Sequence, residues 1–255
     1  MIETPLALPT IAWIAFAIGA VFGAAAQRSN FCTMGAVADI LLMGDWTRLR
    51  MWALAAAVAI TGTSWLQLAG LIDVHESIYT AQRLQWLSHL VGGGLFGVGM
   101  VLASGCGAKT LIRLGGGNLK SLVVFLTLGL VAYMTMRGVF GVFRVNVLEK
   151  AAITFPGGQD IPALLAAAGM DLQLAFWLAV LGIGGGLTAF CLLKRDFWTL
   201  DNLLGGLGTG LMVVAAWYVS GHVGYLAEHP ETLEEAFIAT NSGRMRSEER
   251  RVGKE

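Results

Sequence analysis

The chain has 255 residues, of which 56% are hydrophobic and only 13% are charged, and its formal net charge is zero. Soluble domains carry about 25% charged residues, so a chain this apolar could not cover a water-facing surface. We therefore interpret it as an all-α integral membrane protein, and the absence of any basic excess gives no sign of a nucleic-acid partner.

Apolar runs of spanning length define the predicted transmembrane helices, since a spanning helix needs about 20 residues. About six such runs lie at 9–27, 49–70, 88–105, 119–142, 172–193 and 200–221. The first lacks a basic n-region, so we predict a retained span rather than a cleaved signal peptide. The glycine-rich faces of the third and sixth runs are expected to pack on helices beyond this chain, as at 205–208.

Shorter elements lie between these spans. Residues 29–45 are apolar but too short to cross, and they follow the first span without a polar loop. A re-entrant half-helix that dips into the membrane fits them best, and residues 106–118 are a candidate for a second one. Residues 144–171 include ITFPGGQDIP and are predicted to be a turn-rich stretch outside the membrane or lining a cavity.

The loop lysines and arginines predict the orientation. If the spans alternate, eight of these cations fall on one side and four on the other. The positive-inside rule then places the richer side in the cytoplasm and the N-terminus in the periplasm. The eight are Arg28, Arg48, Arg50, Lys109, Arg113, Lys120, Lys194 and Arg195, and the four are Arg83, Arg137, Arg144 and Lys150.

The last twelve residues, RMRSEERRVGKE at 244–255, differ from the rest because eight of them are charged. They are either a solvated tail or a segment that is not native and resembles translated adaptor read-through. We favour the second interpretation and exclude the segment from the fold. The predicted membrane transport domain is therefore 1–243.

A repeat links two of the spans to the two short elements. Phe22-Gly23 is followed by eight residues and then Cys32, and Phe96-Gly97 is followed by eight residues and then Cys106. A serine lies two or three residues before each cysteine, and small residues follow each cysteine. The chain has only three cysteines, so the shared spacing indicates two equivalent helix breaks, as in transporters that build a site between repeats.

The residues of the second break, Ser104-Gly105-Cys106-Gly107, predict a helix start that can bind an anion. Glycine costs about 1 kcal/mol per residue in a helix interior, so a helix is not expected to continue through it. If a helix restarts there, Cys106 lies at its N-terminus, where free N–H groups and the helix dipole receive an anion. Cys32 would lie likewise at the start of TMGAVADILLM. We predict Cys32, Cys106, Gly105 and Gly107 as substrate-binding residues, with the two sulfurs within about 10 Å of each other.

Other motifs that the same glycines suggest fail on spacing. In GCGAKT, Ala108 separates the glycine from the lysine, which a phosphate loop needs in succession. A dinucleotide fingerprint needs a third glycine where Leu102 stands. No pair of Cys or His residues has zinc-ligand spacing, so we predict neither a metal nor a cofactor.

Three stretches of the chain resemble the YeeE/YedE family of bacterial inner-membrane proteins, which are implicated in the uptake of thiosulfate or related sulfur compounds. They are FGAAAQRSNFCTMGAVAD, FGVGMVLASGCGAKTLIRLGGGNLKSLVV and GLGTGLMVVAAWYVSGHVGYLAEHPETLEEAFIATNSGR, within residues 10–243. The resemblance implies a pseudo-symmetric, inverted-repeat-like transporter fold, here incomplete, because members continue past NSGR with a further Gly-Cys motif. It also implies cysteines along a central path that pass thiosulfate by S–H···S contacts. Cys32 and Cys106 match that pattern, whereas Cys191 lacks a helix break and is predicted to be a core residue.

Two function classes remain open. The first is a transporter for a small sulfur anion such as thiosulfate. The second is a membrane sulfurtransferase, in which a cysteine persulfide hands sulfur to a soluble carrier of the TusA type. No paired general base lies near either cysteine in sequence, so we favour transport and predict no enzyme activity. Lys109 and Arg113 either attract the anion or anchor the chain at the cytoplasmic surface.

Overall fold

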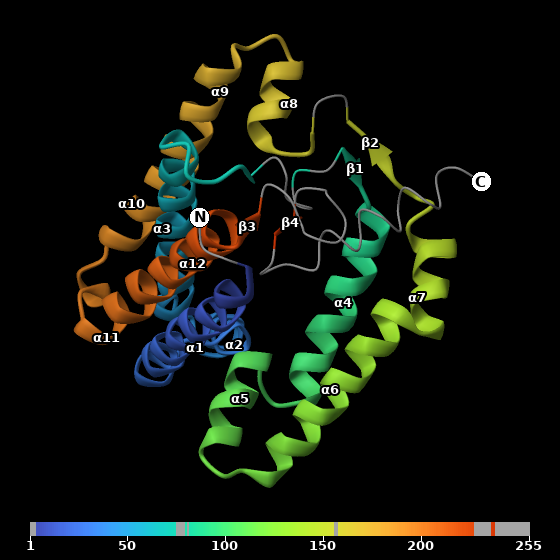
Figure 1. Cartoon of the computed structure of the whole chain (residues 1–255). Coiled ribbons are helices and arrows are strands. Elements are labelled where there is room, and N and C mark those ends of the chain that lie inside the picture. Colours follow the sequence, from blue (N-terminus) through green and yellow to red (C-terminus); the bar gives the residue numbers. More distant parts are fainter. Residues whose placement is uncertain (1–3, 75–79, 81, 156–157, 227–235, 238–255) are drawn as a thin grey trace.

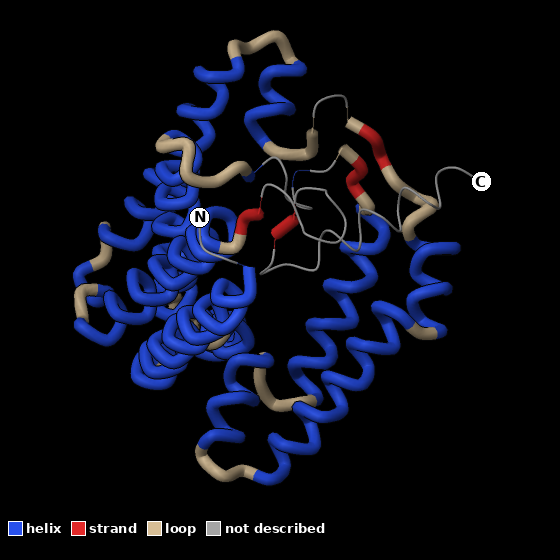
Figure 2. The backbone as a smooth tube through the Cα atoms, viewed as in Figure 1, coloured by secondary structure: helices blue, strands red, loops and turns tan. Residues whose placement is uncertain are grey.

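The computed structural model of the chain describes residues 4–74, 80, 82–155, 158–226 and 236–237. It is mainly helical, and its described strands form two short antiparallel pairs (Figures 1 and 2). The predicted all-α class is therefore confirmed. The charged segment 244–255 lies outside the described residues, so its assignment stays a prediction.

The first half of the chain contains seven α-helices, one π-helical turn and two short strands among its described residues. They are α1 (Thr4–Ser29), α2 (Thr33–Met43), α3 (Thr47–Leu68), β1 (Arg83–Leu84), α4 (Trp86–Leu102), α5 (Gly107–Gly115), α6 (Leu119–Arg137), α7 (Val139–Phe143), η3 (Arg144–Leu148) and β2 (Ile153–Thr154). The elements of the second half are α8 (Ile161–Ala167), α9 (Leu172–Ala179), η4 (Val180–Gly184), α10 (Gly185–Leu192), η5 (Arg195–Phe197), α11 (Leu200–Leu203), η6 (Leu204–Gly208), α12 (Thr209–Tyr218), η7 (Val219–Val223), β3 (Tyr225–Leu226) and β4 (Ala236–Phe237).

Six described stretches are long and apolar enough to cross a membrane, as the sequence predicts. They are Pro9–Met43, Thr47–Leu68, Trp86–Gly115, Leu119–Arg137, Leu172–Leu192 and Leu200–Val223. The first and third each combine a long helix with a short one, α1 with α2 and α4 with α5. The chain is therefore a multi-pass membrane protein, and both predicted short elements are helices.

A first group of helices is centred on α3. The helices α10 and α12 and the π-helical turns η4 and η6 pack against α3, and α1 packs against α12 (Figure 1). Their junction holds a cluster of buried residues: Ala26, Phe31, Met51, Leu54, Ala55, Cys191 and Phe197. The end of α1 and the start of α2 are therefore anchored in the packed part of the molecule.

Three glycines of the last span, Gly205, Gly206 and Gly210, are buried inside this group, so the expectation that they face helices beyond the chain was wrong. A Cβ on Gly206 would lie 2.7 Å from the side chain of Leu54, and one on Gly210 would lie 2.6 Å from Cβ of Val58. The last span approaches α3 closely because these positions carry no side chain. The glycines of α4 differ, because no described atom lies within 4 Å of a Cβ built at Gly92, Gly93, Gly94, Gly97 or Gly99.

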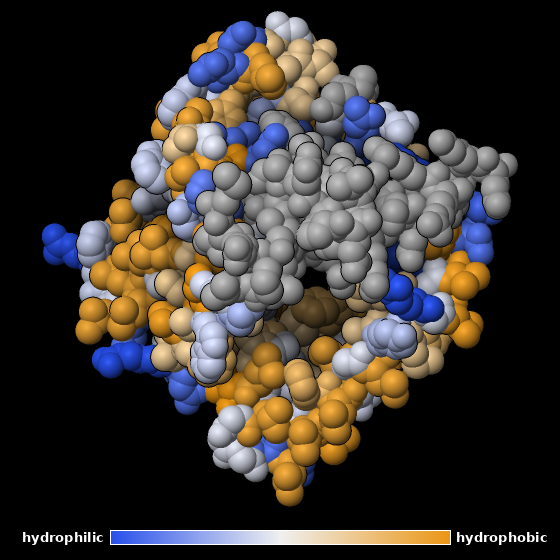
Figure 3. All heavy atoms as spheres, in the orientation of Figure 1, coloured by the Kyte–Doolittle hydropathy of each residue, from blue (hydrophilic) through white to orange (hydrophobic). Residues whose placement is uncertain are grey.

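A second group contains α4, α5, α6 and α7 and lies to one side of the first (Figure 1). Here α5 packs against α6, α6 against α7, and α4 against η3. The span predicted at 119–142 ends earlier, because Gly138 has extended backbone (φ −105°, ψ −160°) and separates α6 from α7. Much of the face in Figure 3 is hydrophobic, and large apolar side chains of α4 and α6 such as Leu95 and Leu126 are exposed. Such a surface suits contact with lipid.

The stretch 144–171, predicted to be turn-rich, contains more regular structure than expected. Strand β2 pairs with β1 in antiparallel register, with Arg83 opposite Thr154. Helix α8 follows, because the Asp160 carboxylate accepts a hydrogen bond from the N–H of Ala163 at 3.3 Å and a proline lies in the first turn.

Candidate functional site

The first helix break separates α1 from α2 and ends at Cys32. Asn30 has a left-handed backbone (φ 53°), and the N–H of Phe31 donates to the carbonyl of Ala26 at 3.1 Å. A turn of this kind commonly ends helices, because it satisfies carbonyls of the last turn. Cys32 then has extended backbone (φ −153°, ψ 125°), and its Sγ accepts a hydrogen bond from the N–H of Gly35 at 3.4 Å. The thiol of Cys32 therefore caps the start of α2.

The second break, between α4 and α5, repeats this geometry at the same positions. Ser104 precedes Cys106 by two residues and has φ 56°. The N–H of Gly105 donates to the carbonyl of Met100 at 3.0 Å. Cys106 has extended backbone (φ −73°, ψ 169°) and is the N-cap residue of α5. The repeat found in the sequence is therefore a repeat of backbone structure.

The two turns are made by residues that rarely adopt this conformation. Asn30 and Ser104 are the only described non-glycine residues with positive φ. Elsewhere in the described chain the positive-φ residues are all glycines: Gly44, Gly70, Gly117, Gly158 and Gly169. The left-handed conformation costs an ordinary residue about 1–2 kcal/mol, although asparagine visits it more easily. Backbone strain of this kind clusters at functional sites.

The two breaks bring their cysteines into direct contact. The Sγ atoms of Cys32 and Cys106 lie 3.6 Å apart, although 74 positions separate the residues in the chain. Both thiols are buried, with exposed fractions of 4% and 6%. This confirms the prediction that the two sulfurs lie within about 10 Å of each other, each at a helix start. Each S–H is a weak donor and each sulfur a weak acceptor, so the pair can present a thiol proton to a third group.

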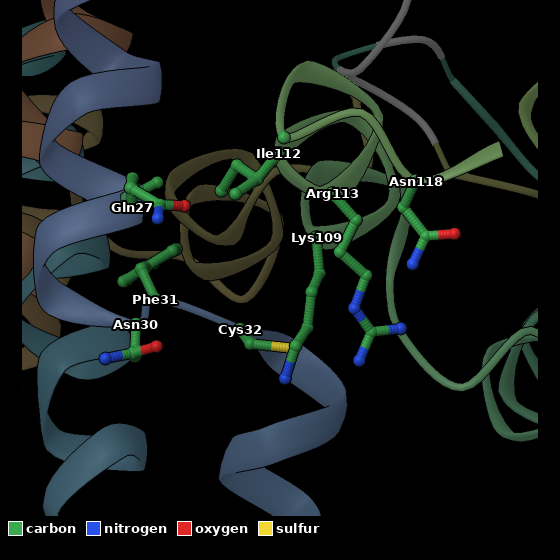
Figure 4. Close-up of a pocket in the computed structure, with 10 residues that line it drawn as sticks. Gln27, Asn30, Phe31, Cys32, Lys109, Ile112, Arg113 and Asn118 are labelled. Atoms are coloured by element: carbon green, nitrogen blue, oxygen red, sulfur yellow. The ribbon is translucent and has the colours of Figure 1, made fainter. Parts of the chain in front are cut away.

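A cavity of about 370 Å³ adjoins Cys32 (Figure 4). In Figure 4 the side chains of Lys109 and Arg113 extend from α5 towards this space. The lining residues are Ala26, Gln27, Asn30, Phe31, Cys32, Lys109, Ile112, Arg113, Gly116 and Asn118. Two are basic, three carry amides and none is acidic. The cavity therefore suits a small anion that can also meet a thiol.

Ion pairs neutralise some cations of the described residues but not the two that line the cavity. The Arg28 guanidinium lies 2.9 Å from the Asp201 carboxylate. That of Arg48 lies 3.2 Å from the carboxylate of Asp39. No ion pair of the described residues includes Lys109 or Arg113, so their charge is available to an anion.

Arg113 also supports the break itself. Its Nη1 donates to the carbonyl of Ser104 at 2.9 Å. The same side chain therefore lines the cavity and holds the turn before Cys106.

The two predicted glycines flank Cys106 in different roles. Gly107 is the first residue of α5, where backbone N–H groups have no partner within the helix. The N–H of Gly105 is already bonded to Met100. Neither glycine is among the residues that line the cavity, so a role for either in binding stays a prediction.

Cys191 is a core residue, as predicted. It lies within α10, its exposed fraction is 0%, and it belongs to the buried cluster around α3. Its Sγ donates to the carbonyl of Arg50 at 3.1 Å. Because Cys191 lies within a regular helix, is fully buried and does not line the cavity beside Cys32, it serves as a natural control for the other two.

Sequence reasoning missed Gln27, Asn30 and Asn118 as cavity residues. The position of Asn30, two before Cys32 as Ser104 is before Cys106, was a signal that could have identified it. Asn118 carried the signature of a helix start, and its Oδ1 accepts from the N–H of Lys120 at 3.0 Å. Its place at the cavity depends on how α5 and α6 meet, which spacing alone does not specify.

Comparisons with known proteins identify the family of the chain. The model of the family described as "Sulphur transport" matches residues 28–243. A relative from Spirochaeta thermophila named thiosulfate transporter TsuA is 30% identical over 162 residues, which are 60% of this chain and 48% of the relative. The thiosulfate transporter TsuA of Escherichia coli is 33% identical over 121 residues, which are 48% of this chain and 32% of the relative. The chain thus spans about half or less of the length of either relative.

Proposed function

The chain belongs to the sulphur transport family, which is the YeeE/YedE family that its motifs resemble, and from this premise we propose that it takes up thiosulfate across the bacterial inner membrane. The observation that carries this proposal is the pair of thiols 3.6 Å apart at two matching helix breaks, beside a basic cavity. In this proposal Cys32 and Cys106 bind the anion transiently and release it onward.

The chemistry of thiosulfate fits the two kinds of group at this site. Thiosulfate is a dianion with a polarisable terminal sulfur at one end and sulfonate oxygens at the other. The thiols of Cys32 and Cys106 donate weak S–H···S hydrogen bonds to the terminal sulfur. Lys109 and Arg113 attract the sulfonate, and Arg113 offers it the planar donors that match an oxyanion. A path of weak contacts suits transport, because the substrate must leave as well as bind.

The helix starts add a further contribution to anion binding. The first N–H groups of α5 have no intrahelical partner and lie at the positive end of its dipole. In this proposal the N–H of Gly107 contacts the substrate directly. Gly105 contributes by having no side chain, because its own N–H is bonded to Met100.

The distribution of cations supports an orientation of the chain in the membrane. Lys109 and Arg113 belong to the side that carries eight of the twelve loop lysines and arginines. By the positive-inside rule this side faces the cytoplasm, with the N-terminus in the periplasm. The cavity is then the cytoplasmic vestibule, where the anion is released, and a soluble sulfur carrier of the TusA type would meet it there.

We propose a transporter rather than an enzyme. A sulfurtransferase needs an activated thiol that accepts sulfur as a persulfide. In the described hydrogen bonds Cys32 contacts the N–H of Gly35 and the thiol of Cys106, and no histidine or carboxylate. Mass spectrometry of the chain after exposure to thiosulfate should therefore find no persulfide on either cysteine.

The binding of radiolabelled thiosulfate to the chain in lipid nanodiscs tests the proposal. Cys106→Ser and Cys32→Ser keep a hydroxyl donor but lose the polarisable sulfur. We expect each to weaken binding about tenfold or more, equivalent to about 1.4 kcal/mol. Cys191→Ser is the matched control and should bind as the wild type does.

Uptake of radiolabelled thiosulfate into cells that express the same variants provides the second readout. We expect the order found for binding to be kept. Equal loss in all three serine variants would mean that folding, not binding, had changed. Unaltered binding in Cys106→Ser would overturn the proposal.

A further inference from the structure

We propose that Cys32 and Cys106 are a modification site, which a hydroperoxide oxidises to an intramolecular disulfide that closes the site. The effect on transport rests on the proposed function, because closure matters only if these thiols receive thiosulfate. The chemical step itself depends only on the geometry of the two cysteines.

The geometry lies close to that of a disulfide. The sulfurs are 3.6 Å apart, and a disulfide bond is about 2.05 Å long, so the two atoms must approach by about 1.5 Å. The glycines on either side of Cys106 are loosely surrounded, because a Cβ built on Gly107 meets no described atom within 4 Å and one built on Gly105 meets only the flexible side chain of Lys109, at 3.5 Å.

Access to an oxidant distinguishes this pair from the third cysteine. Cys32 lines the cavity, so a small hydroperoxide that enters the cavity reaches its sulfur. Cys191 has an exposed fraction of 0% and donates its thiol proton to the carbonyl of Arg50. We therefore expect oxidation to be confined to the pair.

The reaction balances in two steps. A hydroperoxide first transfers its terminal oxygen to one thiol, which becomes a sulfenic acid and leaves an alcohol, or water when the oxidant is hydrogen peroxide. The second thiol then attacks the sulfenic sulfur, the S–S bond forms, the S–O bond breaks, and water leaves with the second thiol proton. Two electrons pass from the two thiols to the O–O bond. A dithiol reductant returns the disulfide to two thiols by thiol–disulfide exchange.

The disulfide would change both the chemistry and the mobility of the site. It removes both S–H donors. It also joins two separately supported elements, because the Asp39–Arg48 ion pair holds α2 on α3 at 3.2 Å, whereas α5 packs against α6. The two breaks could then no longer separate to let an anion pass, so uptake would stop until the bond is reduced.

Thiol counting on the full chain in native membranes tests the inference. The membranes are treated with hydrogen peroxide, quenched, denatured and alkylated with a maleimide before mass spectrometry. We expect three alkylated cysteines in the reduced chain and one, Cys191, after oxidation. A peptide that links Cys32 to Cys106 should appear, and dithiothreitol should restore all three. In Cys191→Ser the disulfide should form and leave no free thiol.

Two results would overturn the inference. One is a chain that keeps all three thiols, or whose cysteines are oxidised only to sulfinic acid or to disulfides between chains. The other concerns the variants Cys32→Ala and Cys106→Ala, which cannot form the proposed disulfide. If hydrogen peroxide removed as many alkylatable thiols from either variant as from the wild type, the inference would fail.

Thiosulfate binding separates this inference from the proposed function. If no disulfide forms but thiosulfate still binds and Cys106→Ser abolishes binding, the inference fails and the proposed function stands. If the disulfide forms and binding is unchanged, both fail. Reversible loss of binding together with disulfide formation supports both.

Discussion

At the scale of single residues, the two turns before the cysteines carry a conformational cost that the rest of the described chain avoids. Asn30 and Ser104 take the left-handed backbone that glycines adopt at the other described turns of positive φ. Asn30 lines the cavity with its side chain, which gives a reason to keep a side chain there. The carbonyl of Ser104 accepts the hydrogen bond from Arg113. That bond uses the backbone alone, so the serine side chain can be removed without losing it.

We predict that Ser104→Gly stabilises the chain. Glycine removes a left-handed cost of about 1–2 kcal/mol and adds about 0.5–1 kcal/mol of chain entropy, so a net gain of about 0.5–1 kcal/mol is expected. Gly117→Ala is the matched control, because it places a side chain at φ 84° with no described atom within 4 Å of its Cβ. It should lose about 1 kcal/mol. Unfolding in detergent micelles measures both, and a less stable Ser104→Gly would show that the serine side chain itself holds the turn.

The sequence predicted the two cysteines but little of what surrounds them. The spacing from Phe-Gly identified Cys32 and Cys106 because a chain with three cysteines rarely repeats such a spacing by chance. Their separation of 3.6 Å depends on how two distant breaks pack, which no local pattern specifies. Lys109 and Arg113 were ambiguous, since an anchoring lysine and an anion-binding lysine look alike in sequence.

At the scale of elements, the last span packs on α3 through positions without side chains. Gly205, Gly206 and Gly210 are buried against residues of α1 and α3. In a membrane the helices gain little from apolar contact alone, so close approach through small residues is a main source of their association. These glycines therefore allow the close packing of the last span on α1 and α3, which positions Cys32 just after the end of α1.

We predict that Gly210→Ala destabilises the helix packing. Its Cβ would lie 2.6 Å from Cβ of Val58 and 2.8 Å from the carbonyl oxygen of Ala55, and the backbone atom has little room to move. The cost of such overpacking is about 1–3 kcal/mol. Gly186→Ala is the control, because no described atom lies within 4 Å of its Cβ, and it should be neutral or slightly stabilising. Equal midpoints of thermal unfolding for the two variants would contradict this packing.

The elements were predicted in number and kind more reliably than at their ends. Hydropathy identified six spans because a spanning helix must be apolar over its length. It placed the end of the fourth span beyond Gly138, since the residues that follow are equally apolar and only the backbone changes there. Helix α8 was missed although Asp160 and the proline after it form a helix start, because the glycines before them suggested only turns.

At the scale of the whole molecule, the site lies between two groups of helices. The first surrounds α3 and carries Cys32, and the second contains α4 to α7 and carries Cys106 (Figure 1). A site between two groups can open or close by a movement of one against the other, as in transporters built from repeats. The matching breaks in α1–α2 and α4–α5 are consistent with such a repeat, which the sequence anticipated from two cysteine motifs.

The most direct test of this account is to locate the substrate with selenosulfate, in which selenium replaces the terminal sulfur of thiosulfate. The anomalous signal of selenium in crystals of the chain soaked with this analogue marks the position of that atom. We predict one peak within hydrogen-bonding reach of both Cys32 and Cys106, with the sulfonate directed towards Lys109 and Arg113. A peak away from both cysteines, or an unchanged peak in Cys106→Ser crystals, would contradict the claim that the paired thiols bind thiosulfate.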